Sequence, residues 1–77
     1  MYTVDVFGWE PGFRKVSHTK LLQERCSLGL AEAKAATDAL LRGDAITLRV
    51  ASQLEAEALV VQLSELGAHA RVQSSAA

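Results

Sequence analysis

The chain has 77 residues, of which 49% are apolar and 22% are charged, and its net charge is -1. A chain this short forms one domain around one core. The near-neutral charge excludes an overall basic field that would attract nucleic acid or anionic membranes. The single cysteine, Cys26, excludes an internal disulfide, and no cysteine or histidine stands near it to complete a zinc site.

Targeting signals are missing from the sequence. No apolar run approaches the roughly 20 residues that a helix needs to cross a bilayer. The N-terminus also has no basic segment followed by an apolar stretch, as a signal peptide would. We therefore expect a cytoplasmic protein that is complete at Met1 and has no membrane partner.

The first half of the chain predicts a strand and two helices. Apolar and polar side chains alternate over residues 1–7, and a loop at 8–12 with one proline and two glycines ends this strand. A helix should begin near Phe13 or Arg14. Three- and four-residue spacing directs one set of its side chains toward the core: His18, Leu21, Leu22, Arg25 and Cys26.

A break at residues 27–29 separates the first helix from a second one, which stops at Gly43. The apolar spacing of this second helix predicts its core-facing residues: Leu30, Ala33, Thr37, Leu40 and Leu41. Alternation over residues 45–50 then predicts a second strand, with Thr47 and Arg49 on its outer face.

The third helix has the best-marked start in the chain. Ser52 and Glu55 are spaced as a capping box, in which each side chain accepts a hydrogen bond from the backbone amide of the other. The helix should run to about Leu66 and end at Gly67. Its apolar stripe consists of Ala56, Leu59, Val60, Leu63 and Leu66. Alternation predicts a third strand at 68–72, so we expect a domain over residues 1–73 and a flexible tail at 74–77.

Three segments carry a family resemblance: Ser27-Leu-Gly-Leu-Ala-Glu-Ala-Lys34, Glu55-Ala-Glu-Ala-Leu59, and Leu63-Ser-Glu-Leu-Gly-Ala-His-Ala-Arg-Val72. In this order, the segments resemble the C-terminal, factor-binding domain of the bacterial ribosomal stalk protein, over about residues 2–73. The resemblance implies a single α+β domain with the order β-α-α-β-α-β, in which a three-stranded sheet carries three helices on one face. The first strand would lie between the other two, an order that the pattern alone does not determine.

The resemblance also implies a function. The family domain is not an enzyme and needs no cofactor; it binds translational GTPases through its first helix and the start of its second. Its contact positions correspond here to Lys15, Val16, Thr19, Lys20, Gln23, Leu30 and Lys34. Because this chain starts directly at the first strand, without the dimerisation region of a stalk protein, we expect a stand-alone module for a protein partner, such as a translational GTPase or another ribosome-associated factor.

Two departures from the family pattern affect this surface. Thr19 stands where the family usually has an aliphatic side chain, and Gln23 stands where it has a basic one. Losing an apolar anchor and a cation should weaken such binding or redirect it to another partner. The alternative interpretation is a solvated lysine face with Val16 as one scattered exposed aliphatic residue.

An aromatic loop provides a second hypothesis, with Phe7, Trp9, Glu10 and Phe13 as its site residues. Aromatic side chains on loops often anchor partners, and these rings could instead close the open end of the core. The adaptor that delivers N-degron substrates to the bacterial Clp protease has the same fold, with an acidic amine pocket after its first strand. Only Glu10 could supply a carboxylate here, so an adaptor or regulator remains the alternative function.

No catalytic, cofactor or metal site is expected. His18 and His69 have no nucleophile partner in the sequence, and the glycines near Pro11 lack phosphate-loop spacing. Arg14 and Arg25 add to a basic bias on the first helix, and a nearby ring could stack on a base. Without a known RNA-binding motif, and at a near-neutral charge, we do not expect nucleic acid as a partner. The sequence leaves the oligomeric state open.

Overall fold

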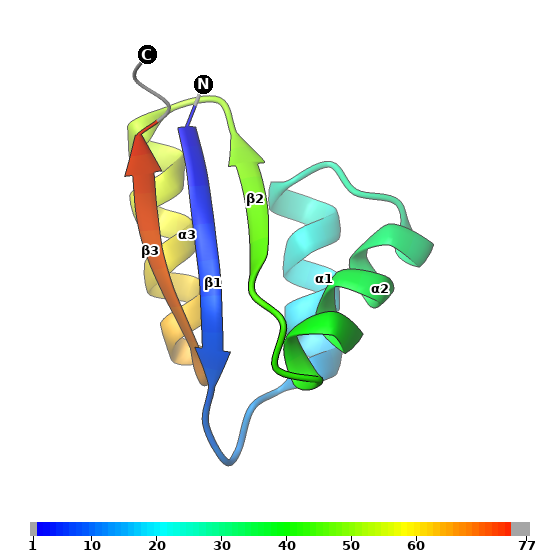
Figure 1. Cartoon of the computed structure of the whole chain (residues 1–77). Helices are drawn as coiled ribbons and strands as arrows, with labels where there is room; N and C mark the ends of the chain where they lie inside the picture. Colours follow the sequence, from blue (N-terminus) through cyan, green and yellow to red (C-terminus); the bar gives the residue numbers. More distant parts are fainter. Residues whose placement is uncertain (1, 75–77) are drawn as a thin grey trace.

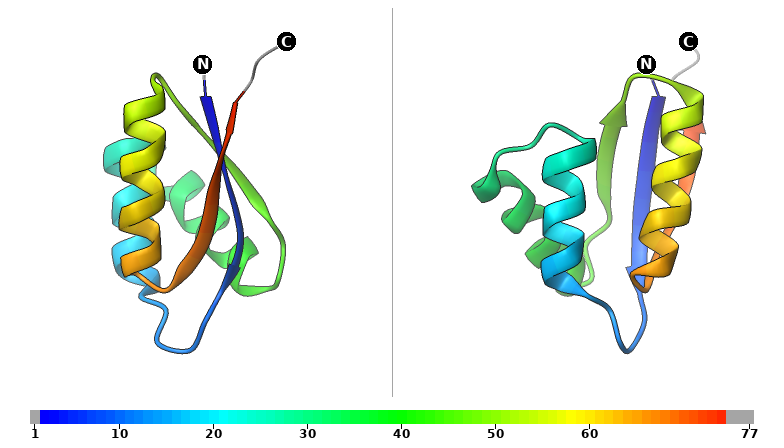
Figure 2. Two further views of the ribbon diagram at one scale, coloured as in Figure 1. Left: turned by 90° about the vertical axis from the view of Figure 1, so that its left-hand side faces the viewer. Right: turned by 180° about the vertical axis from the view of Figure 1, so that it is seen from behind.

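The computed structural model describes residues 2–74 (Figure 1). Its elements in chain order are β1 (Tyr2–Trp9), α1 (Lys15–Arg25), α2 (Leu30–Leu41), β2 (Ile46–Val50), α3 (Gln53–Glu65) and β3 (Ala68–Ser74). The strands form one antiparallel sheet in the order β2-β1-β3. All three helices lie on one side of this sheet and leave its other face open (Figure 2). The expected α+β class, element order and central first strand are confirmed.

The first strand is longer than predicted. A bulge between Val6 and Gly8 shifts the register, after which Gly8 pairs with His69 and Trp9 pairs with Ala68. The predicted loop at 8–12 is therefore wrong for its first two residues. The strand continues because β3 supplies backbone partners beyond the bulge, which local alternation in β1 does not reveal.

The last strand also extends further than predicted. The β1 pairing continues through Thr3 opposite Gln73 and Tyr2 opposite Ser74. The Thr3 hydroxyl additionally donates to the Gln73 carbonyl oxygen at 3.0 Å. The predicted tail at 74–77 therefore begins too early, because Ser74 belongs to the strand; residues 75–77 lie outside the described part of the chain.

The core lies between the sheet and the helices. Its least exposed side chains are those that the spacing directed inward: Val4, Val6, His18, Leu22, Ala33, Leu40, Ala56, Leu59 and Leu63. Two predicted members of the core, Arg25 and Leu30, are exposed instead. Arg25 is the last residue of α1 and keeps its guanidinium in water, whereas Leu30 begins α2 and faces α1 across the surface.

The start of α3 differs from the predicted capping box in one bond. The Ser52 hydroxyl oxygen accepts from the Glu55 amide at 3.2 Å, as predicted. The Glu55 carboxylate accepts from the Ala51 amide at 3.2 Å, one residue earlier than the box requires. This bond still satisfies a backbone donor beside the helix start and keeps the carboxylate near the positive end of the helix dipole.

The loop between β1 and α1 is held against the turn that ends α3. The Glu10 amide donates to the Gly67 carbonyl oxygen at 2.9 Å, and the Arg14 amide donates to the Leu66 carbonyl oxygen at 3.0 Å. Gly67 has φ +91°, and a Cβ atom at this position would lie 3.1 Å from the Phe13 Cα atom. The close approach of the β1–α1 loop to this turn therefore depends on Gly67. This approach also fixes the segment that leads directly into α1.

Candidate functional site

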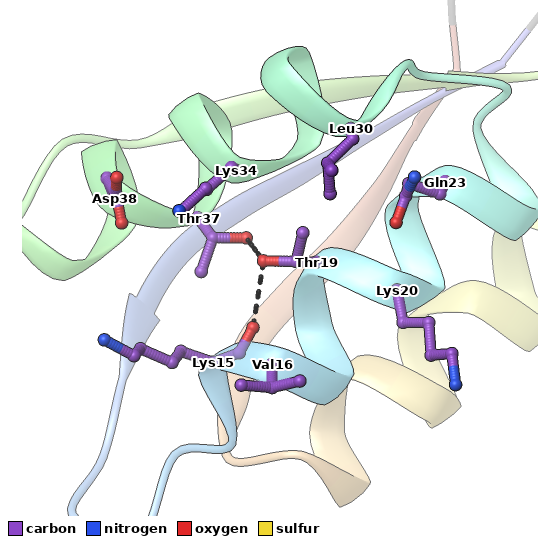
Figure 3. A pocket seen from close by; sticks show the side chains of 9 residues that line it. All are labelled: Lys15, Val16, Thr19, Lys20, Gln23, Leu30, Lys34, Thr37 and Asp38. Atoms are coloured by element: carbon purple, nitrogen blue, oxygen red, sulfur yellow. Dashed lines mark hydrogen bonds between the residues drawn. The ribbon is translucent and has the colours of Figure 1, made fainter.

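A groove of about 390 Å³ lies between α1 and α2 (Figure 3). We call it the α1–α2 groove. Nine residues line it: Lys15, Val16, Thr19, Lys20, Gln23, Leu30, Lys34, Thr37 and Asp38. The first seven are those that the family resemblance selected as contact positions. The fold therefore gathers the expected contact residues from both helices around one depression.

Two exposed aliphatic side chains form the apolar part of the groove. Val16, on the outer side of α1, is 74% exposed, and Leu30, in the first turn of α2, is 62% exposed. A single exposed aliphatic residue is ordinary on a protein surface. Two that line the same groove from different helices form a patch that an apolar side chain of a partner can cover.

Three lysines surround this apolar patch. Lys15 and Lys20 extend from α1 on either side of Val16, and Lys34 extends from α2 (Figure 3). Asp38 is the one carboxylate that lines the groove. Within residues 2–74, no Asp or Glu oxygen lies within 4.0 Å of a lysine ammonium. The edge of the groove therefore carries lysine ammonium groups that the carboxylates of an acidic partner could contact.

A buried hydrogen-bond network supports the floor of the groove. The Thr37 hydroxyl donates to the Ala33 carbonyl oxygen at 3.0 Å, and its oxygen lies 2.8 Å from His18 Nδ1. The Thr19 hydroxyl lies 2.9 Å from the same Thr37 oxygen and 3.0 Å from the Lys15 carbonyl oxygen. Thr19, the departure from the family pattern, therefore directs its hydroxyl toward the protein interior.

The hydrogen bonds of this network suit a neutral His18. A Thr37 hydroxyl that donates to Ala33 can only accept from His18, an arrangement in which Nδ1 carries the proton and Nε2 does not. Nε2 is buried, with no hydrogen-bond partner among the described residues, and the Phe13 ring centroid lies 5.1 Å from that of His18. A second proton would have no acceptor, and burial lowers the pKa of His18 to about 4.

Thr37 and Asp38 belong to the groove but were missed by sequence reasoning. Thr37 was assigned to the core, where it is indeed buried, and only the structure shows that its hydroxyl joins the groove floor to His18. Asp38 follows Lys34 by four residues on α2, a spacing that places both side chains on one helix face. This four-residue spacing is the sequence pattern from which Asp38 could have been predicted to lie beside Lys34.

The predicted aromatic site divides into two parts, the first of which lies on the open face of the sheet. Phe7 is 53% exposed, and its ring stacks beside that of His69 with the centroids 6.2 Å apart. The Arg71 guanidinium lies 5.4 Å from the centroid of the Phe7 ring. Phe7 therefore belongs to a cross-strand cluster with β3 and does not join the other predicted aromatic residues.

The second part lies where the β1–α1 loop meets the helices. The Trp9 ring centroid is 6.1 Å from that of Phe13, which also contacts His18. Trp9 is 42% exposed, whereas Phe13 is half-buried against the core. The Glu10 side chain points toward β3 instead, where its carboxylate lies 3.5 Å from His69 Nε2. The four residues thus do not form one pocket.

The other chemically active side chains are dispersed. Cys26 is half-buried, and burial raises the pKa of its thiol. Residues 2–74 contain no group of three His, Cys, Asp or Glu side chains that could hold a metal ion. In the same part of the chain, no helix combines the length and apolar character needed to span a bilayer.

Comparison with known proteins found neither a family model nor a curated protein that matches the chain. The resemblance to the stalk domain therefore remains a prediction from the three quoted segments. Exposed apolar side chains coincide in the α1–α2 groove with lysines that no carboxylate of the described residues contacts.

Proposed function

We propose that this chain is a non-enzymatic protein-binding module that holds its partner in the α1–α2 groove. One observation carries the proposal: exposed Val16 and Leu30 share a groove with three lysines that no carboxylate of the described chain contacts. Exposed apolar side chains surrounded by one sign of charge are typical of an interaction surface, because the apolar patch gives affinity and the charges select the partner.

The groove indicates the chemistry of its partner. A segment that fits would insert one or two aliphatic or aromatic side chains between Val16 and Leu30 and would carry carboxylates beside them. The resemblance to the stalk domain supports a translational GTPase, or another ribosome-associated factor, as the source of this segment. Thr19 and Gln23 reduce the apolar and positive character of the surface relative to that family, so we expect weaker binding or a different factor.

Affinity capture from a bacterial lysate tests the proposal. The wild-type domain should recover a protein partner, and the double variant Val16→Asp, Lys20→Glu should reduce the recovery at least tenfold, because it places two carboxylates in the groove. The matched control is Val61→Asp, Arg49→Glu, which makes comparable charge changes on α3 and on the open sheet face. This control should capture at least as much partner as the wild type.

A Trp9→Ala variant distinguishes the alternative function. Under the proposal, Trp9→Ala captures the same partner as the wild type, because Trp9 does not line the groove. Recovery that depends on Trp9 and survives the groove double variant would contradict the proposal and favour an adaptor that uses the aromatic residues. Identification of the recovered protein by mass spectrometry then shows whether a translational GTPase is among the partners.

A further inference from the structure

Helix α3 is apolar on two opposite faces. Ala56, Leu59 and Leu63 face the core and are at most 1% exposed. On the other side, Leu54 and Val61 are 77% and 59% exposed, and Ala58 lies between them along the helix. We call Leu54, Ala58 and Val61 the α3 outer stripe. An amphipathic surface helix normally turns a polar face to solvent, so a second apolar stripe indicates a surface that something covers.

The charges beside the α3 outer stripe are mostly negative. Helix α3 carries Glu55, Glu57 and Glu65 and contains no Lys or Arg. The cations that border this helix come from other elements: Arg25 lines a small cavity together with Leu54 and Glu55, Arg49 lines another with Glu55, and Lys20 lines a third with Glu65. Helix α3 itself therefore presents three carboxylates and no cation, and the neighbouring cations lie at its margins.

The α1–α2 groove has the reverse arrangement. It combines three lysine ammonium groups with the single carboxylate of Asp38, and it offers the two aliphatic side chains Val16 and Leu30. The groove and helix α3 itself thus match in apolar content and carry opposite charges. Such complementarity favours contact between the two surfaces and disfavours contact of either surface with itself.

We propose that the α3 outer stripe of a second copy of this chain occupies the α1–α2 groove. The spacing of the stripe, at positions i, i+4 and i+7, is that of helices that bind in apolar grooves, and it spans about 10 Å along the axis. All three helices lie on one side of the sheet (Figure 2), and in the proposed dimer a two-fold axis would relate the two contacts, each of one groove with one stripe. The second copy and the partner of the proposed function therefore exclude each other.

Sedimentation of the purified chain tests this self-association without any partner. The wild type should form dimers as its concentration rises, and the dissociation constant should increase at least tenfold between about 0.05 M and about 0.5 M salt, because salt screens the lysine–carboxylate attraction. Lys34→Glu damages the groove, and Glu57→Lys damages the α3 surface. Each variant alone should remain monomeric, whereas their equimolar mixture should dimerise, because it combines an intact groove with an intact α3.

An Arg71→Glu variant, which reverses a charge beside Phe7 on the open sheet face, is the control and should dimerise like the wild type. A wild type that stays monomeric at every concentration would overturn the inference, as would dimers that persist in both single variants or a mixture that stays monomeric. The inference uses the groove of the proposed function, yet the two can fail separately. Glu57→Lys keeps the groove intact, so it should still capture the partner even if self-association is never observed.

Discussion

Acidification from pH 7 to pH 4 is expected to lower the free energy of unfolding by about 3 kcal/mol through His18 alone. Burial lowers the pKa of His18 from its ordinary value of 6.5 to about 4 in the folded protein. Between these two values, the unfolded chain binds a proton that the folded chain excludes. The stabilisation is therefore fully present above pH 6.5 and is lost as the pH falls toward 4.

The structural reason is the hydrogen-bond arrangement around His18. Nδ1 already donates to Thr37, and Nε2 is buried with no partner among the described residues, so imidazolium would leave one donor unsatisfied. Protonation would therefore disturb the floor of the α1–α2 groove, which Thr37 and Thr19 form. We expect partner capture to decline over the same pH range as the stability.

Urea denaturation of the wild type and of His18→Gln at several pH values between 7.5 and 4 measures this linkage. The variant should lose about 3 kcal/mol less than the wild type over that range, because glutamine does not titrate. His69→Gln removes the exposed histidine instead and should keep the wild-type decline. Parallel pH profiles for the wild type and His18→Gln would show that His18 is not the group responsible.

The second large effect is expected at Gly67, whose replacement by alanine should lower the free energy of unfolding by about 3 kcal/mol. A positive φ disfavours any Cβ atom, and at this position the new atom would also lie 3.1 Å from the Phe13 backbone. The chain would have to move the β1–α1 loop away from the turn that ends α3. Since α1 begins at Lys15, directly after this loop, the displacement should also weaken partner binding.

Gly12→Ala is the matched control for this prediction. Gly12 has φ +95°, close to the +91° of Gly67, but a Cβ atom added at Gly12 would meet no other atom within 4 Å. Its replacement should therefore cost only the backbone strain of about 1 kcal/mol. The difference between the two variants in chemical denaturation isolates the contact with Phe13. Equal losses in both variants would contradict the importance of that contact.

The helices, strands and core could largely be predicted because they follow from periodicity. Alternation placed Leu48 and Val50 inward, and helical spacing placed Leu59 and Leu63 inward, as observed. The errors occur where a distant segment decides the outcome. Trp9 is in a strand because β3 pairs with it, and no local pattern contains that information.

The candidate site was predictable in part for the same reason. Val16 and Lys20 lie on the outer side of an amphipathic helix, and the quoted motifs pointed to them. The groove itself depends on how α1 and α2 pack, which spacing within one helix does not specify. The link from Thr19 through Thr37 to His18 joins residues up to 19 positions apart, and only the folded structure brings them into hydrogen-bond distance.

The most direct test of the proposed binding groove is a map of amide chemical shifts in the isotope-labelled chain as the captured protein is added. We expect the largest changes in α1 at residues 15–23 and in α2 at residues 30–38, which contain the groove-lining side chains. The Val16→Asp, Lys20→Glu variant should show none of these changes. Changes confined to Trp9 and Phe13, or to the open face of the sheet, would contradict the groove as the binding site.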